Sequence, residues 1–311
     1  MAHTRTTLPV GRGLLYATVA AAAWGTAGAA ATALHHISGL GPLAVSFWRF
    51  ALGALLLLAA RPLLGLGRWT ARRVLRPRQL LVGLCMAVFQ TAYLAAVDQA
   101  GLAVGTAVTM GTVPVFTAVG ARLVLGERLG RAGSGTVALA VAGLLLLALG
   151  SAGGTGTGGS PLLGFVCALV SAAGCAFVNL LGQHGRGSGA EPYDAALAGF
   201  VVGAVLLLPA CRGGDLLPGG GHLERSLLLL GYLGAVPSAL AYGLFFAAAT
   251  VVRATTVSVL MMLEPLAALL LAVSAFGERL TPAAAAGTAL LLAGVVVLAR
   301  AERTGPVSAP Q

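Results

Sequence analysis

The sequence lacks lysine altogether and is poor in charge: its 19 basic residues are all arginines, and it has nine acidic residues among 311. Soluble domains carry about a quarter of their residues as charged side chains, whereas this chain carries 9%. With 58% hydrophobic residues and a mean hydropathy of +0.93, the chain is expected to expose its apolar surface to lipid. The scarcity of charge therefore excludes an ordinary soluble domain.

Several kinds of chemistry are absent as well. No nucleotide-binding loop is present, which argues against ATP hydrolysis by this chain. The acidic residues form no cluster at a predicted membrane face, which argues against an enzyme embedded in the membrane. The four cysteines lie in or beside apolar stretches without metal-ligand spacing, so we expect neither disulfides nor a metal or other cofactor.

Long apolar stretches are abundant. A bilayer core about 30 Å thick is crossed by about 20 helical residues, and ten stretches of the chain are long enough. They run approximately over residues 13–34, 43–64, 79–97, 102–125, 132–150, 161–182, 193–210, 226–249, 254–276 and 282–300. Because these runs are continuously apolar and do not alternate, they predict helices and not a barrel. The expected fold is an all-α integral membrane protein with ten transmembrane helices.

The arginines predict the orientation. If the N-terminus is cytoplasmic, fifteen arginines lie in inside segments and three, Arg212, Arg225 and Arg279, lie outside. Cytoplasmic loops carry such an excess of positive charge. We therefore expect an inner or plasma membrane protein whose short tails, residues 1–12 and 301–311, are both cytoplasmic. The high pI, near 10.7, is then explained by arginines in the cytoplasmic loops, and no nucleic-acid partner is expected.

The sequence contains an internal repeat. Pro114 recurs 151 positions later as Pro265, and the run Gly-Glu-Arg-Leu at 126–129 recurs at 277–280. Phe50 and Gly53 recur at an offset of 150 as Phe200 and Gly203. The halves, 13–150 and 161–300, contain five predicted spans each. Since five is odd, the second half enters the membrane from the opposite face, which predicts inverted repeats related by an axis in the membrane plane.

The first apolar stretch has a second interpretation. Arg5 and Arg12 before an alanine-rich run also fit a cleavable signal peptide. The stretch has an internal counterpart at 164–182, however, and internal copies are not cleaved. We therefore favour a first span that is retained.

Glu264 is the sharpest candidate for function. It lies about ten residues into its predicted span, hence about 15 Å deep at 1.5 Å per residue, near the midplane. Pro265 follows it and disfavours helical geometry at that point, and Pro114 is expected to interrupt the matching helix of the first half. Glu264 could bind a cationic group of a substrate or exchange a proton. The alternative is a carboxyl that only supports the helix break.

Arg49 is the other charge predicted to lie inside the membrane. It could bind a substrate carboxylate, or it could pair with Asp98 at the end of the third span. Five polar or aromatic residues could complete a binding site: Trp24, Gln90, Tyr93, Asn179 and Tyr242. A residue of this kind, taken alone, more often serves hydrogen bonding or packing between helices than ligand binding.

Glycines mark the two equivalent helix ends. Gly126 and Gly277 can each end a helix, and the following Glu127 and Glu278 precede the next span, where the positive helix N-terminus favours a carboxylate. We interpret these four residues as hinge and capping positions and assign no catalytic residue.

These paired motifs resemble the tandem EamA-domain pattern of the drug/metabolite transporter superfamily. The resemblance rests on Pro114 with 126–129, on Glu264 and Pro265 with 277–280, and on Trp24 and Arg49, and it covers about residues 13–300. It implies a ten-helix carrier, typically an exporter of amino acids, other metabolites or small drugs, with a central cavity between the repeats. Val113 stands where the second copy has Glu264, so a carboxylate role would belong to the second half.

The function predicted from these observations is secondary transport. The carrier would export a small organic solute by alternating access, and an amino-acid-like solute is the favoured class. We hypothesise that proton exchange at Glu264 couples transport to the proton gradient. A membrane-embedded enzyme acting on a lipid or isoprenoid, and a passive channel, are the alternatives. The sequence does not define the solute, the direction of flux, the coupling ion, or whether the protein is a monomer or a homodimer.

Overall fold

The structure is a computed structural model of the chain. It describes residues 9–66, 76–125, 160–184, 192–211, 216–219, 222–249 and 263–304, together with positions 135, 138–139, 142–143, 146 and 260. Over these residues the chain is helical and contains no strand, which confirms the all-α prediction. The helices are α1 (Val10–Ser38), α2 (Pro42–Ala60), α3 (Pro77–Ala100), α4 (Leu102–Leu125), α6 (Pro161–His184), α7 (Pro192–Ala210), α8 (Leu223–Gly234), η3 (Ala235–Leu240), α9 (Ala241–Ala249), α11 (Leu263–Phe276) and α12 (Pro282–Thr304).

Helix ends follow the local sequence. Five helices begin with proline, whose missing N–H costs nothing at the first helical position: α2, α3, α6, α7 and α12. Glycines with positive φ follow three helix ends: Gly39 (φ 69°) after α1, Gly101 (φ 85°) after α3 and Gly277 (φ 63°) after α11. The N–H of Gly39 donates to the carbonyl oxygen of His35 and so satisfies an end of α1.

Five stretches of the described helices are long and apolar enough to cross a membrane: Val10–Ser38, Pro42–Ala60, Pro77–Ala100, Pro161–Leu181 and Leu223–Phe245. Shorter apolar helices occupy the predicted spans at 102–125, 193–210, 254–276 and 282–300. Most of the predicted span at 132–150, like residues 254–259, lies outside the described residues. The helices are consistent with the ten predicted spans.

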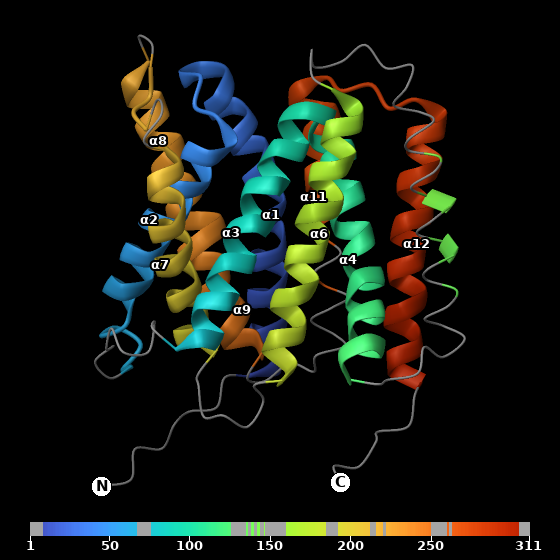
Figure 1. Ribbon diagram of the computed structural model, residues 1–311, viewed down its shortest axis with the longest axis horizontal. Helices are drawn as coiled ribbons and strands as arrows, with labels where there is room; N and C mark the ends of the chain where they lie inside the picture. Colours follow the sequence, from blue (N-terminus) through green and yellow to red (C-terminus); the bar gives the residue numbers. More distant parts are fainter. Residues whose placement is uncertain are drawn as a thin grey trace, which may run out of the picture.

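The two halves cross the molecule in opposite directions (Figure 1). At one end, here named the Asp98 end, the N–H of Ser160 before α6 donates to Gln99 Oε1 near the end of α3. At the other, the Arg61 end, Arg61 after α2 pairs with Asp194 in the first turn of α7. Helix α1 begins at the Arg61 end, low in Figure 1, whereas its counterpart α6 begins at the Asp98 end. This confirms the inverted arrangement.

Equivalent residues of the two halves meet where α2 packs on α7. The rings of Phe50 and Phe200 lie edge to face at 5.4 Å between centroids. A Cβ on Gly53 would come within 3.2 Å of the Phe200 ring, and one on Gly203 within 3.1 Å of the Phe50 ring. Each glycine therefore leaves room for the other half's phenylalanine, so the repeat in the sequence is also a repeat of contacts.

A second pair of contacts obeys the same symmetry and gives a test of the packing. A Cβ on Gly83 would lie 2.3 Å from Val202 Cβ, and one on Gly234 would lie 2.4 Å from Leu52 Cβ. We expect Gly234→Ala to destabilise the protein by about 1–3 kcal/mol, because overpacking forces helices apart. Gly231→Ala, on the same helix with nothing within 4 Å, should be neutral or slightly stabilising. Equal melting temperatures of the two variants in detergent would contradict this packing.

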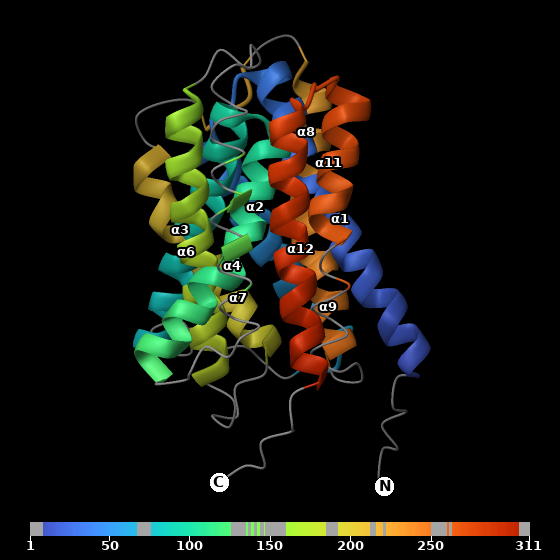
Figure 2. The same ribbon diagram turned by 90° about the vertical axis from the view of Figure 1, so that its right-hand side faces the viewer.

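Helix α1 contacts helices of both halves. It packs against α8, η3, α9 and α11 of the second half and against α3 and α4 of the first. Helix α4 of the first half packs against both α11 and α12 of the second, and Figure 2 shows it beside α12. Helices of both halves therefore surround the interior in which the predicted site residues lie.

Candidate substrate-binding site

Six of the seven predicted binding residues lie on five helices that surround the interior. Trp24 lies on α1, Arg49 on α2, Gln90 and Tyr93 on α3, Tyr242 on α9, and Glu264 on α11. Arg49 lies within electrostatic range of Tyr93, Tyr242 and Glu264, and the Tyr242 ring contacts that of Trp24. Gln90 is one helical turn before Tyr93, on the same face of α3. The structure thus brings these six residues into one interior region.

Arg49 is buried, with 7% of its surface exposed, and its Nε donates to Ser238 Oγ at 3.1 Å. Within the described part of the chain, no salt bridge joins Arg49 to a carboxylate. Burying a cation costs several kcal/mol unless it is paired, so a guanidinium in this position is suited to bind an anionic group.

Glu264 faces the same region from the start of α11. It lies in the first turn, where the positive end of the helix dipole favours a carboxylate, and it is partly buried. A Cβ on Gly25 of α1 would come within 2.6 Å of the Glu264 carbonyl oxygen. The bare backbone of Gly25 therefore lets α1 approach α11 at the level of the carboxylate.

Aromatic rings line the region in an unbroken row. Trp24 contacts Tyr242 at 5.0 Å and Phe245 at 5.4 Å between ring centroids, and Tyr242 contacts Phe200 at 5.1 Å. Phe200 then meets Phe50. These contacts, edge to face except for the tilted pair Trp24–Phe245, hold the rings in place and present an apolar wall beside the two charged side chains.

Two buried donors of the predicted site residues have no hydrogen-bond partner among the residues that the structure describes. They are the indole Nε1 of Trp24 and the amide Nε2 of Gln90. Buried polar atoms are nearly always paired, so unused donors of this kind need an explanation. A bound solute with acceptor atoms would supply the missing partners.

Two of the predicted residues have other roles in this structure. The Tyr93 hydroxyl and Thr106 Oγ1 are hydrogen-bonded at 3.0 Å, which joins α3 to α4, so this residue also serves as a link between helices. Asn179 is exposed on α6 and does not join the interior group.

One of the two predicted helix breaks is absent from the structure. Helix α4 continues through Pro114, although we expected an interruption there; a proline removes one backbone hydrogen bond, and packing against neighbouring helices can offset that loss. Pro265 lies in the first turn of α11, and residues 261–262 just before this helix lie outside the described part of the chain, so the expected break at Pro265 stays a prediction. Gly126 and Glu127 lie outside the described residues.

Glu278 caps a helix, but not the one that follows it. Its Oε1 and Oε2 accept the N–H groups of Leu102 at 2.7 Å and Ala103 at 3.0 Å, at the start of α4. The carboxylate of the second half therefore satisfies the helix N-terminus of the first. The sequence predicted the type of role and missed the partner, because the partner is 176 residues away.

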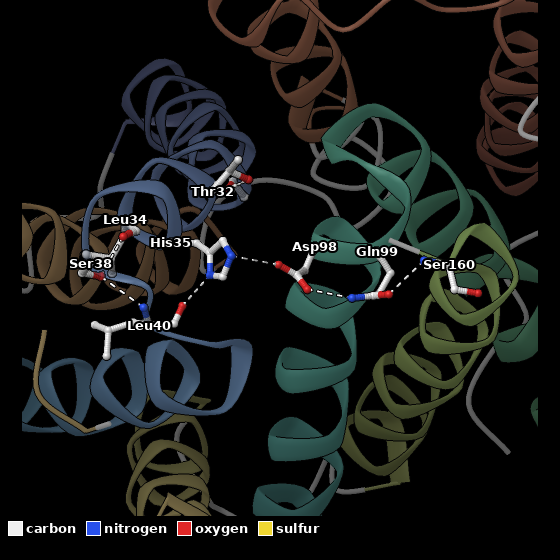
Figure 3. Close-up of polar contacts among 9 residues, drawn as sticks. Thr32, Leu34, His35, Ser38, Leu40, Asp98, Gln99 and Ser160 are labelled. Carbon is white, nitrogen blue, oxygen red and sulfur yellow. Dashed lines mark hydrogen bonds and ion pairs between the residues drawn. The ribbon is translucent and has the colours of Figure 1, made fainter. Parts of the chain in front are cut away.

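Asp98, the partner considered for Arg49, is engaged elsewhere. Its Oδ1 lies 3.6 Å from His35 Nε2, and its Oδ2 accepts from Gln99 Nε2 at 2.9 Å. Figure 3 shows this chain of contacts from His35 on α1 through Asp98 to Ser160 before α6. The network ties the halves together at the Asp98 end and leaves Arg49 free of this carboxylate.

Sequence reasoning missed Ser238, Phe200 and Phe245 as members of the region. Phe200 was recognised as a repeat position, but nothing in the sequence placed it beside Tyr242. Pro237, in the middle of a predicted span, is the signal that could have drawn attention to its neighbour Ser238.

Comparisons with known proteins agree with this architecture. The model of the EamA-like transporter family matches the chain twice, over residues 11–149 and 162–300. The chain belongs to the EamA-like transporter family. Within this transporter family it is 30% identical, over 93% of its length and 94% of the relative's, to an uncharacterised transporter, YwfM, of Bacillus subtilis strain 168.

A second relative of this EamA-like transporter is a probable amino-acid metabolite efflux pump of Salmonella typhimurium strain LT2. The two are 29% identical over 88% of this chain and 91% of the pump. A solved crystal structure shares the fold with a TM-score of 0.63, covering 94% of this chain and 99% of the other at 20% identity. The protein is thus a multi-pass membrane transporter and not an enzyme.

Proposed function

We propose that this EamA-like transporter exports a small amino-acid-like solute by alternating access, with protons as the coupling ion. The observation that carries the proposal is the placement of Arg49 and Glu264. They bring opposite charges, one from each half, into one interior region without forming a salt bridge in the described part of the chain. A zwitterion with an apolar side chain complements this arrangement, with its carboxylate at Arg49, its ammonium at Glu264 and its side chain on the aromatic wall.

The name of the Salmonella relative, an amino-acid metabolite efflux pump, favours the same solute class and direction. The arginine distribution favours the Arg61 end as the cytoplasmic side of an inner or plasma membrane, with residues 13–150 and 161–300 as the two halves. Their relative rocking would expose the interior to either side. Both a monomer and a homodimer are compatible with this mechanism.

Transport against a gradient tests the proposal. The purified protein is reconstituted in liposomes, an inside-acid pH gradient is imposed, and uptake of radiolabelled amino acids, nucleosides, sugars and cationic drugs is measured. We expect one or more amino acids to accumulate several-fold above the outside concentration and to leave again when a protonophore collapses the gradient. Equilibration without accumulation would indicate a passive channel, and accumulation of only another solute class would overturn the amino-acid assignment.

A further inference from the structure

The span that ends at α9 contains a short π-helix, η3, whose backbone chemistry is set by Pro237. Proline has no N–H, so the carbonyl of Leu233, four residues earlier, loses its ordinary helical donor. The hydroxyl of Ser238 donates to that carbonyl oxygen instead, at 2.8 Å. The hydroxyl hydrogen of Ser238 is therefore held in a fixed direction, and its oxygen is left to accept from elsewhere.

The Ser238 oxygen accepts a hydrogen bond from Arg49. Ser238 is completely buried, and its Oγ accepts the hydrogen of Arg49 Nε at 3.1 Å. Gly53, one turn after Arg49 on α2, makes this approach feasible, because a Cβ there would lie only 3.1 Å from Ser238 Cβ. The bond joins α2 of the first half to η3 of the second.

Because Arg49 uses its Nε for the bond to Ser238, its terminal nitrogens can bind a ligand. A guanidinium has five N–H donors and can bind a carboxylate through two of them side by side. With Nε bonded to Ser238, the edge formed by the two terminal nitrogens is left for such a carboxylate. The hydrogen bond also restricts rotation of the long side chain, which lowers the entropy lost when a ligand is bound.

We propose that Ser238 is a positioning residue for the solute: through the contacts Leu233–Ser238–Arg49, the π-helix aims the guanidinium of Arg49 at the solute's carboxylate. This inference rests on the proposed amino-acid transport and deepens it. It assigns a role to the π-helix, which is a rare structure that often occurs at functional sites.

The test compares two probes that differ by one carboxylate, L-phenylalanine and phenethylamine, chosen because the aromatic wall suits their shared ring. Ser238→Ala is expected to raise the KM for phenylalanine about tenfold with little change in maximal rate, since a hydrogen bond to a charged group is lost. The KM for phenethylamine, which has no carboxylate to be positioned, should stay within about twofold of the parent value. Ser238→Thr, which keeps the hydroxyl, should restore the parent KM.

Ser226→Ala is the matched control. Ser226 is equally buried on the same span, but among the contacts that the structure describes its hydroxyl donates only to the carbonyl of His222, the residue just before α8. Its KM values should equal the parent's. The Ser238→Cys variant should have a KM for phenylalanine between those of the parent and Ser238→Ala, because cysteine is nearly isosteric with serine but forms weaker hydrogen bonds. It replaces Ser238→Thr in the comparison if threonine is too large for the site.

The outcomes separate the two proposals. Equal effects of Ser238→Ala on both probes, or no effect on either, would overturn the positioning role while leaving amino-acid transport in place. Transport of neither probe and of no other amino acid by the parent protein would overturn the proposed function, and the role of Ser238 with it. Melting temperatures of the variants within a few degrees of the parent show that the comparison concerns folded protein.

Discussion

Replacing Arg49 by methionine is expected to reduce amino-acid transport about 30- to 1,000-fold at low solute concentration. Truncating one partner of a buried charge pair costs about 2–4 kcal/mol, and every 1.4 kcal/mol corresponds to tenfold in affinity. Methionine keeps the length of the side chain and can remain buried, so the bundle should still fold. Initial rates of uptake into liposomes, measured over a range of solute concentrations, give the loss directly.

Two further variants make the Arg49 result specific. Arg49→Lys keeps the positive charge but has no Nε to donate to Ser238 and no planar fork for a carboxylate, so we expect it to be intermediate. Arg225→Met removes an exposed arginine from α8 and should transport like the parent. Unchanged transport by Arg49→Met would mean that the buried guanidinium has a structural role and that the carboxylate binds elsewhere.

The fold was predictable from the sequence because its main determinants are local or repetitive. The length of the apolar stretches predicts the helices, and prolines mark where several of them begin. The odd number of spans in each half predicts that the two halves are inverted. The repeat also contained information on contacts, since Phe50 packs on its own counterpart Phe200 and each of these rings packs on the equivalent glycine of the other half, Gly203 or Gly53. A residue pattern with period 3.6 was hardly needed for any of these predictions.

The pairing of polar groups could not be predicted in the same way. Asp98 was as suitable a partner for Arg49 as Ser238 was, and the choice between them depends on how α1, α2 and η3 approach one another. Glu278 was likewise assigned to the helix that follows it and caps α4 instead. The partners of charges and hydroxyl groups inside a bundle depend on how helices far apart in the sequence pack together. Hydropathy, in contrast, depends only on residues that are neighbours in the chain.

The same distinction explains why hydropathy missed the π-helix η3. An apolar window over 226–249 predicts a single helix, and the structure divides it into α8, η3 and α9. A π-helix changes neither the length nor the polarity of the segment, so it leaves no trace in an apolar average. Pro237 and Ser238 together are the local signal, because one removes a backbone donor and the other replaces it.

Replacing Glu264 by glutamine is expected to abolish gradient-driven accumulation while leaving the protein folded. Glutamine has nearly the shape of glutamate and can still form hydrogen bonds, but it cannot take up and release a proton as the site changes sides. In liposomes with an inside-acid pH gradient, the parent should concentrate its amino acid several-fold. The Glu264→Gln variant should, at most, equilibrate the solute between the two sides.

The control for this substitution is another carboxylate. Glu224→Gln alters an exposed residue in the first turn of α8 and should accumulate solute like the parent. Solute exchange without a pH gradient separates binding from coupling: a variant that still exchanges labelled for unlabelled solute has kept its site and lost its use of protons. If Glu264→Gln instead transports as fast as the parent and with the same dependence on the gradient, protons are coupled at another residue, and the carboxylate at the start of α11 serves the fold alone.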